Sequence, residues 1–415
     1  MGRGVVSLPA SRQTRESARV RIGISLLGVT HEMGGHFQYA TTMLGDLAEK
    51  YSCEELVVFV DDLSALRAEI VALPPAQYVE VPAESRSRVR MALRFFLGHI
   101  GGKSRNTWIR GRYGVFDEQG CDVIFYPYWD FAPVISSTPA IAAILDCAPR
   151  VAPELMPWRA RRALDLLIRS IARHARVVLT ESELTREHLA THYGVDPRKV
   201  VSLPLKPPRY LFNGKGRDAA DVLARHGLRP GYLFLPGRFG SYHNTERVLA
   251  AMRLLLSRDP AIDVRAVLVG VRDSEMDAAR SCIKALGLQS VVALIGFVPD
   301  EDMAALYQSA AAMPFPSLLG PSSIPLCEAM ALGCPVIVST IEGHADLVGD
   351  AGIFINPYDT EEIASAIRAL LVNPSARADL RAKGLRRFSA LQSFDHAGTL
   401  QRLAMDVMQK RASVY

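Results

Sequence analysis

Apolar residues along this chain gather in short runs that are separated by longer amphipathic segments. In the first half these runs predict strands at 20–27, 56–60, 78–81, 122–127, 140–146, 177–180 and 200–204. In the second half they predict strands at 232–235, 264–270, 291–296 and 335–339. Helical spacing between and after the runs predicts helices at 37–50, 158–174, 302–310, 361–371, 375–388 and 396–409. Alternating strands and helices are typical of repeated βαβ units, so we expect an α/β fold of doubly wound parallel sheets.

The length of the chain implies more than one domain. At 415 residues it is too long for one core and suits two domains of about 200 residues each. Prolines at 204, 207 and 208, followed by a polar run, indicate an interdomain linker. The predicted order is a disordered leader (1–18), a first domain (19–205), the linker (206–229), a second domain (230–390) and a C-terminal helix within 391–415.

The stretch 315–357 carries the strongest chemical signal. A strand end is followed by small residues from Gly320 to Pro325 and then by a helix. Free N–H groups and the helix dipole at such a point favour a phosphate or diphosphate. Glu328 lies about one turn into the helix, where its carboxylate can accept hydrogen bonds from ribose hydroxyls. The alternative is purely structural: Ser322 and Ser323 cap the helix, and Glu328 interacts with its positive end.

This stretch resembles the nucleotide-sugar signature of the retaining GT-B glycosyltransferases of family 4. The resemblance rests on Ile324 and Pro325, on Glu328, and on the run A-M-A-x-G-x-P-V-I that ends at Ile337. It implies a GT-B fold, with two Rossmann-like domains facing across a cleft and a C-terminal helix that crosses back to the first domain. It also implies a nucleoside diphosphate sugar of the UDP or GDP type as donor.

The resemblance implies further site residues. Arg238 would neutralise the diphosphate, His243 stands where the family has a lysine, and Asn244 matches the next position. The backbone of Phe297 and Val298 would read the nucleobase, and Gly34, Gly35 and His36 would form a loop facing phosphates and acceptor. From the residues alone, each has a structural alternative: Arg238 as a surface arginine, the glycine pair as a turn and His36 as a solvated histidine.

Two positions depart from the family pattern. Gly320 stands where the family has a glutamate that contacts the transferred sugar, and Leu145 stands where a histidine precedes Asp146. Asp146 itself matches. Tyr126, Tyr128 and Asp130 are other polar candidates at the same strand ends.

Composition narrows the function classes. The net charge of +5 is too small to indicate a nucleic-acid partner, and 49% apolar with 22% charged residues is ordinary for a globular protein. The six cysteines have no metal-ligand spacing, which favours free thiols in a reducing cytoplasm. No run of about 18 apolar residues predicts a membrane span. Residues 86–112 hold eight basic and no acidic residues, predicting either a helix on an anionic membrane surface or a solvated basic face.

The predicted activity is transfer of a hexose, of mannose or glucose type, from the donor to a hydroxyl acceptor with retention. The product would be a polysaccharide or glycolipid, and the acceptor could be lipid-linked. The resemblance implies that no metal or other cofactor is required. Two alternatives stay open, a non-catalytic nucleotide-sugar-binding subunit and a GT-B sugar-nucleotide epimerase. The location would be cytoplasmic, with possible attachment to the cytoplasmic face of the membrane.

Overall fold

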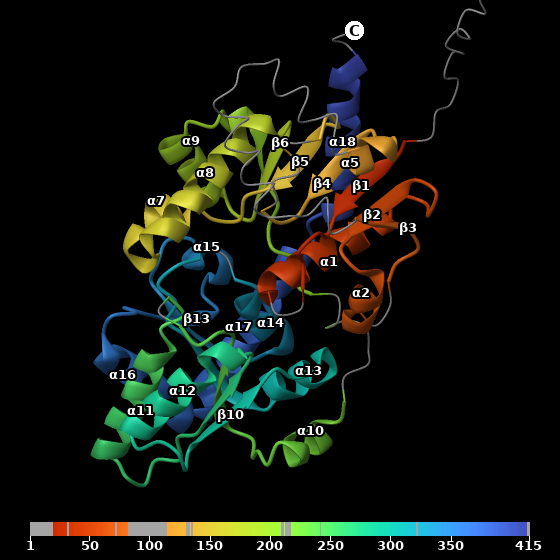
Figure 1. The fold of residues 1–415 in the computed structure, drawn as a ribbon. Coiled ribbons are helices and arrows are strands. Elements are labelled where there is room, and N and C mark those ends of the chain that lie inside the picture. The colour runs from red at the N-terminus through yellow and green to blue at the C-terminus, as the bar shows by residue number, and fades with distance from the viewer. Residues whose placement is uncertain are drawn as a thin grey trace, which may run out of the picture.

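Two parallel sheets form separate lobes of the molecule, one above the other in Figure 1. The computed structural model describes residues 20–30, 33–70, 73–81, 114–129, 133, 136–208, 211, 217–240, 242–320 and 323–412. The leader 1–18, the basic segment 86–112 and the candidates Asp130 and Ser322 therefore lie outside the described residues.

The first sheet has the first strand of the chain in its interior. Its order is β3-β2-β1-β4-β5-β6-β7, so β1 pairs with both β2 and β4, and the winding direction changes there. This change of direction makes the loop after β1 a typical ligand position. The strands are β1 (Ile22–Ser25), β2 (Leu56–Val60), β3 (Gln77–Glu80), β4 (Val123–Tyr126), β5 (Ala140–Ala143), β6 (Val177–Thr180) and β7 (Val200–Ser202).

The second sheet repeats this arrangement. Its order is β10-β9-β8-β11-β12-β13, and the direction changes between β8 and β11. The loops after these two strands therefore open at the same edge. The strands are β8 (Tyr232–Pro236), β9 (Ala266–Val269), β10 (Val292–Gly296), β11 (Ala310–Phe315), β12 (Val336–Ser339) and β13 (Gly352–Ile355).

Helices cover both sheets. The first domain carries α1 (Gly35–Ala48), α2 (Leu63–Glu69), α5 (Gly114–Glu118), α7 (Ala148–Val151), α8 (Trp158–His174) and α9 (Glu183–Tyr193). The second carries α10 (Ala219–Arg225), α11 (Thr245–Arg258), α12 (Asp273–Ala285), α13 (Asp300–Gln308), α14 (Ile324–Leu332), α15 (His344–Val348), α16 (Thr360–Val372) and α17 (Pro374–Gln392). Because helices bury both faces, strands such as β2 and β12 are buried along their whole length and consist almost entirely of apolar residues.

The predicted elements agree closely with the structure, with one error of assignment. The helix expected at 302–310 is α13, which begins at Asp300 and ends at Gln308. Ala310 instead begins strand β11, because the apolar run that follows it is buried between β8 and β12. Within the range expected as linker, Ala219–Arg225 forms α10, which packs against α13.

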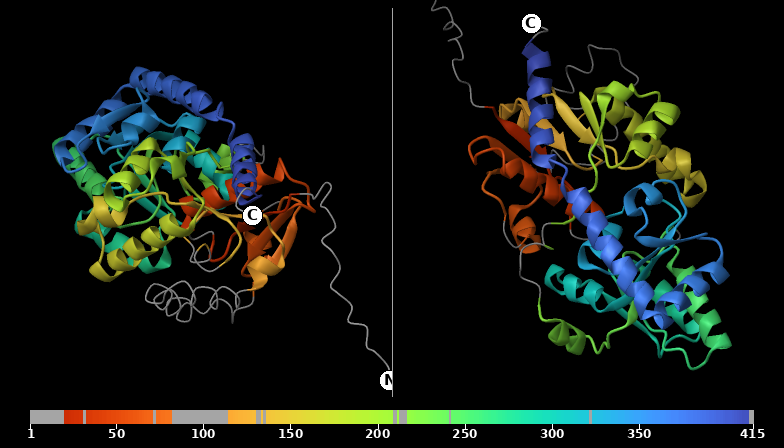
Figure 2. Two further views of the ribbon diagram at one scale, coloured as in Figure 1. Left: turned by 90° about the horizontal axis from the view of Figure 1, so that it is seen from above. Right: turned by 180° about the vertical axis from the view of Figure 1, so that it is seen from behind.

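The chain passes between the domains twice, at neighbouring places. After α17, helix α18 (His396–Ala412) lies against α1 of the first domain, and Figure 2 shows α17 and α18 extending from one lobe into the other. At this point His396 Nε2 is 2.6 Å from the carbonyl oxygen of Pro204, on the other connection. Lys206 next to it donates to buried Asp46 of α1 at 2.5 Å. A small cavity between the connections is lined in part by Asp46, Lys206 and His396.

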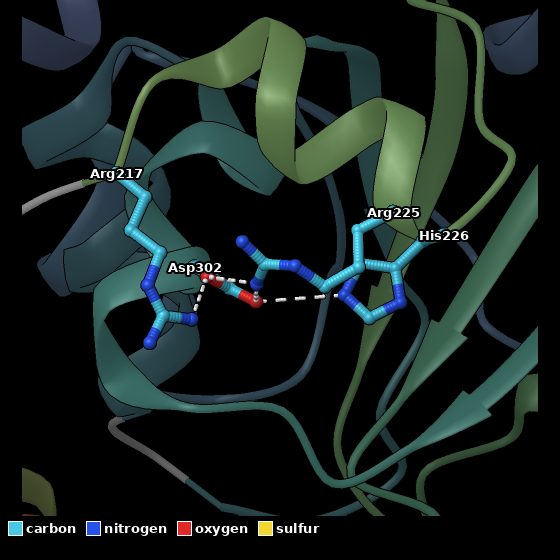
Figure 3. Close-up of polar contacts among 4 residues, drawn as sticks. All are labelled: Arg217, Arg225, His226 and Asp302. Carbon is cyan, nitrogen blue, oxygen red and sulfur yellow. Dashed lines mark hydrogen bonds and ion pairs between the residues drawn. The ribbon is translucent and has the colours of Figure 1, made fainter.

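A buried carboxylate anchors α10 to the second domain. The side chain of Asp302 in α13 is fully buried and accepts from Arg217 at 2.8 Å and Arg225 at 2.9 Å, with His226 Nε2 at 3.5 Å (Figure 3). Burial acts to raise the pKa of Asp302, but the hydrogen bonds from Arg217 and His226 and the arginine charges outweigh it, so this pKa lies below its usual value. The cluster therefore needs an ionised carboxylate.

Asp302→Asn should lower the free energy of unfolding by about 2 to 3 kcal/mol near neutral pH, because two guanidinium groups lose the negative charge and one of the oxygens of their buried partner. A depressed carboxyl pKa stabilises the fold above the unfolded pKa of about 3.9, and this stabilisation is lost as the pH falls through the folded value. The difference from wild type should therefore shrink in acid. Urea unfolding at several pH values measures it.

The matched control is Asp263→Asn, since Asp263 pairs with Arg265 at 2.8 Å but is largely exposed. Its effect should stay within about 0.5 kcal/mol. Equal losses in the two variants would show that the Asp302 cluster contributes no more than a surface ion pair.

Candidate functional site

The loops at the carboxyl edges of the two sheets meet between the domains. A Cβ added to Gly35, at the start of α1, would lie 3.7 Å from Cδ1 of Ile324, at the start of α14. Gln38 Nε2 lies 3.4 Å from Asp300 Oδ2, and His188 Nε2 lies 3.6 Å from Glu342 Oε2. The glycine loop predicted at Gly34 and Gly35 thus faces the second domain beside α14.

Gly34 occupies a conformation that only glycine adopts readily. Its φ of 56° and ψ of −118° place it outside the regions open to other residues, immediately before the first turn of α1. His36 follows in that turn and packs edge-on against Tyr128 at 4.9 Å between ring centroids, while Tyr128 stacks on Trp129. Burial lowers the pKa of His36 to about 4, against a hydrogen bond with Met33 that raises it. His36 is therefore neutral at physiological pH and sits within an aromatic group.

Helix α14 begins at the site with its N-terminal N–H groups uncapped by Ser323. Ser323 is the extended N-cap residue, but its side chain makes no capping hydrogen bond. Ile324 is buried and Pro325 lies in the first turn. A serine cap was the structural alternative for this segment, and at Ser323 that hydrogen bond does not form. The helix N-terminus is thus an electrostatically positive feature at the domain boundary.

Glu328 is held by a tyrosine that sequence reasoning missed. The Glu328 side chain points from the second turn of α14, and the residue is only 5% exposed. Tyr307 of α13 donates its hydroxyl to Glu328 Oε2 at 2.6 Å. A hydroxyl donor at this distance fixes one carboxylate oxygen. The contact joins residues that are 21 positions apart and lie on different helices. No spacing rule applied to the sequence predicts it.

Glycines bring three neighbouring strand ends close together. Gly237, Gly270 and Gly296, at or just after the ends of β8, β9 and β10, have φ values of 115°, 85° and 81°. A Cβ on Gly270 would lie 3.3 Å from the backbone nitrogen of Gly237, and one on Gly296 would lie 2.9 Å from Met276 Cε. The positive φ disfavours other residues at all three positions, and at Gly270 the nearby backbone leaves little room for a Cβ as well. The loops that carry Arg238 and Phe297 consequently start from one compact edge.

Arg238 is already engaged in an ion pair. Its Nε donates to Oε1 of Glu275 in α12 at 2.8 Å, and its Nη2 lies 2.7 Å from the same oxygen. Oε2 of the same carboxylate accepts from the backbone N–H of Phe239 at 3.0 Å. The Arg238 side chain remains 45% exposed. It is therefore fixed along one edge and accessible elsewhere.

His243 is buried beside this pair. Its Nε2 has no hydrogen-bond partner among the described residues. Burial, and then the positive charge of Arg238, lower the pKa of His243 to about 4, against an opposing effect of Glu275. A neutral imidazole thus stands where the sequence resemblance expects a lysine.

Tyr242, which sequence reasoning did not single out, stacks obliquely on His243 at 4.1 Å between ring centroids. Burial raises the pKa of its phenol, Arg238 lowers it, and Asp146 of the first domain raises it. Charges on both domains therefore act on this phenol.

Asn244 uses its side-chain amide inside the protein. Its Nδ2 donates to the carbonyl oxygens of Pro316 at 3.0 Å and Pro357 at 2.7 Å, and its φ of 60° is in the left-handed region. Arg247 donates to its Oδ1 at 3.0 Å. Asn244 therefore ties together the loops after β8, β11 and β13, and positions them.

Asp146 lies at the first-domain side of the boundary. Burial raises its pKa, against the hydrogen bond that the Ala148 N–H donates to Oδ1 at 2.9 Å. Its neighbour Leu145 is buried and apolar, so no polar side chain replaces the histidine of the family pattern at that position. Of the other candidates, Tyr126 is buried within β4, and Tyr128 packs on His36.

The base-reading candidates lie at the edge of the second sheet. Phe297 is 44% exposed directly after β10, whereas the next residue, Val298, is buried.

Among the described residues, no group of three or more His, Cys, Asp or Glu side chains could hold a metal ion, and no helix is long and apolar enough to cross a membrane.

Comparison with known proteins places the second domain in a sequence family. Residues 224–387 match the family described as "Glycosyl transferases group 1". The O-antigen chain mannosyltransferase B of Escherichia coli is 26% identical over 247 residues, which cover 59% of this chain and 65% of the relative. The D-inositol 3-phosphate glycosyltransferase of Rhodococcus opacus is 26% identical over 222 residues, covering 52% and 50%. The chain thus spans between half and two thirds of the length of these relatives.

Solved structures match nearly the whole chain. Sucrose-phosphate synthase from Thermosynechococcus elongatus superposes with a TM-score of 0.71 at 19% identity, covering 94% of this chain and all of that one. Anabaena HepE in complex with UDP and glucose gives a TM-score of 0.67 at 17% identity, covering 95% and 99%. These likenesses confirm the predicted fold. The chain has a GT-B fold of two Rossmann-like domains, and residues 224–387 in its second domain match the glycosyl transferases group 1 family.

Proposed function

We propose that the protein is a retaining glycosyltransferase of family 4 that transfers a hexose, of mannose or glucose type, from a nucleoside diphosphate sugar to a hydroxyl acceptor. One observation carries the proposal: Arg238, Glu328 and the N-terminus of α14, which the Ser323 side chain does not cap, lie on loops and helices that open at one edge of the second sheet, inside the region matching glycosyl transferases group 1. The relative named O-antigen chain mannosyltransferase B favours a role in polysaccharide or glycolipid assembly.

Each group has a distinct role in the proposed reaction. Glu328 accepts hydrogen bonds from the ribose, while Phe297 and Val298 border the base. The N-terminus of α14 and Arg238 neutralise the diphosphate, whose charge grows as the glycosidic bond breaks. The departing phosphate oxygen then takes the proton of the acceptor hydroxyl on the same face of the sugar. Asp146 and the loop of Gly34, Gly35 and His36 border the acceptor side.

Because protein groups supply this positive charge, the proposed reaction needs no metal ion and no other cofactor. We further propose a cytoplasmic location. The observation that all six cysteines are free thiols supports it. A lipid-linked acceptor at an anionic membrane surface would suit the basic segment 86–112.

A non-catalytic nucleotide-sugar-binding subunit is the second candidate. Leu145 and Gly320, which stand where the family has sugar-contacting side chains, bring no polar group to the site. Nucleotide binding would survive this loss, since neither position serves the ribose or the base. Binding and turnover therefore have to be measured separately.

We expect one of the nucleotides UDP, GDP and ADP, together with its nucleotide sugar, to raise the melting temperature of the protein in a saturable way. A ligand that binds only the folded state stabilises that state. That nucleotide sugar should be consumed by hydrolysis or transfer, at a rate that EDTA leaves unchanged. Absence of any nucleotide shift would overturn the proposal. Binding without consumption of any donor would instead select the non-catalytic subunit.

Glu328→Gln should weaken nucleotide binding by roughly 10-fold or more, since a hydrogen bond to a charged group contributes about 1.5 to 3 kcal/mol. Calorimetry with the free nucleotide measures the effect. Tyr307→Phe keeps the carboxylate and removes only its internal hydrogen-bond donor, so it should weaken nucleotide binding by less. If the affinity of Glu328→Gln equals that of wild type, Glu328 does not bind the ribose.

Affinity for a nucleotide sugar should rise between pH 7 and pH 5. The diphosphate adds negative charge beside His243, which raises the pKa of the imidazole above its free value of about 4, so binding takes up a proton and strengthens as the pH falls. A bound pKa one unit above the free value would strengthen binding by roughly 2-fold at pH 5, and each further unit would add up to roughly 10-fold. A nucleotide sugar is the right probe because its diphosphate has no proton to lose in this range. His243→Gln should abolish the pH dependence, and a slope that persists in this variant would assign it to another group.

A further inference from the structure

Glu275 puts a negative charge where the proposed function needs positive charge. Its side chain, 12% exposed, lies in the first turn of α12, next to the arginine proposed to bind a diphosphate. At a separation of about 4 Å, two like charges repel by roughly 4 kcal/mol at a protein surface. As the third residue of α12, Glu275 also accepts from the backbone N–H of Arg272, which caps the helix but does not account for its contact with Arg238. Its position beside Arg238 therefore calls for a role that acts through that arginine.

The contacts of Glu275 fix the guanidinium in one plane. Oε1 accepts a hydrogen bond from Nε of Arg238 at 2.8 Å and forms an ion pair with Nη2 at 2.7 Å, so both contacts lie along one edge of the planar fork. Oε2 accepts from the N–H of Phe239 at 3.0 Å and is 3.4 Å from the backbone nitrogen of Arg272. The carboxylate thus joins the loop after β8 to the start of α12. An arginine held along one edge can still donate from Nη1 to a second anion.

We propose that Glu275 is a positioning residue for phosphate-charge stabilisation: it holds Arg238 in place so that the free edge of the guanidinium meets the diphosphate oxygens as the donor bond breaks. This inference rests on the proposed function. A cation that is already oriented does not have to move when negative charge develops on the diphosphate, and this favours the transition state over the bound donor. The negative charge of Glu275 weakens ground-state attraction for the same diphosphate. The two effects have opposite signs, and this separates the proposal from a structural role.

Glu275→Gln keeps the shape of the side chain and removes its charge. We expect kcat to fall by roughly 10- to 100-fold, the usual loss when a residue that orients a functional group is changed. The dissociation constant for the nucleoside diphosphate should stay at the wild-type value or decrease. Glu275→Asp should recover part of kcat. The control Glu361→Gln removes the same charge from a two-contact pair with Arg258 and should change neither quantity.

A double-mutant cycle with Arg238→Ala completes the test, because it is insensitive to a general loss of stability. If Glu275 acts through Arg238, Glu275→Gln should have no further effect on kcat in the Arg238→Ala background. Additive losses, an unchanged kcat, or parallel losses of kcat and nucleotide affinity would each overturn the positioning role while leaving the proposed function intact. If the wild type shows no nucleotide shift in its melting temperature, the proposed function fails, and the inference fails with it.

Discussion

Parallel strand pairing is the constraint on which the rest of this structure depends. Every strand pairing in the described part of the chain is parallel, so each sheet has all its carboxyl ends at one edge. The two edges meet where Gly35 approaches Ile324. Residues as distant in sequence as Asp146, Arg238 and Glu328 consequently lie around one boundary. The chemistry of the protein is confined to loops, while the strands carry only its packing.

The strands and most helices could be predicted because burial on both faces leaves an apolar signature that a single sequence displays. The end of α13 could not, since Ser309 and Ala310 suit a helix or a strand, and only pairing of β11 with its neighbours decides. The positions of Gly34, Gly35 and α14 followed from motif and spacing. These are local features, in which the residues that define the geometry are adjacent in the chain.

The partners of the site residues could not be predicted, for a different reason. Tyr307 with Glu328, Glu275 with Arg238, and Asn244 with Pro316 and Pro357 are contacts between separate elements. The sequence motif identifies one residue of each contact and gives no information about its partner. For Asn244 the difference is large, because an amide expected beside the donor is used to tie loops together. A motif identifies which residue stands at a site, whereas its partners decide how freely that residue can act.

The neighbouring crossings between the domains restrict how the two lobes can move. Pro204 and His396 belong to different connections and touch each other, with Lys206 and Asp46 beside them. Two bodies joined at a single point can swivel in any direction, but a short paired joint permits little besides rotation about an axis through it. The lobes should therefore open like a book along the side that holds His396. The far side, where His188 approaches Glu342, would then travel furthest.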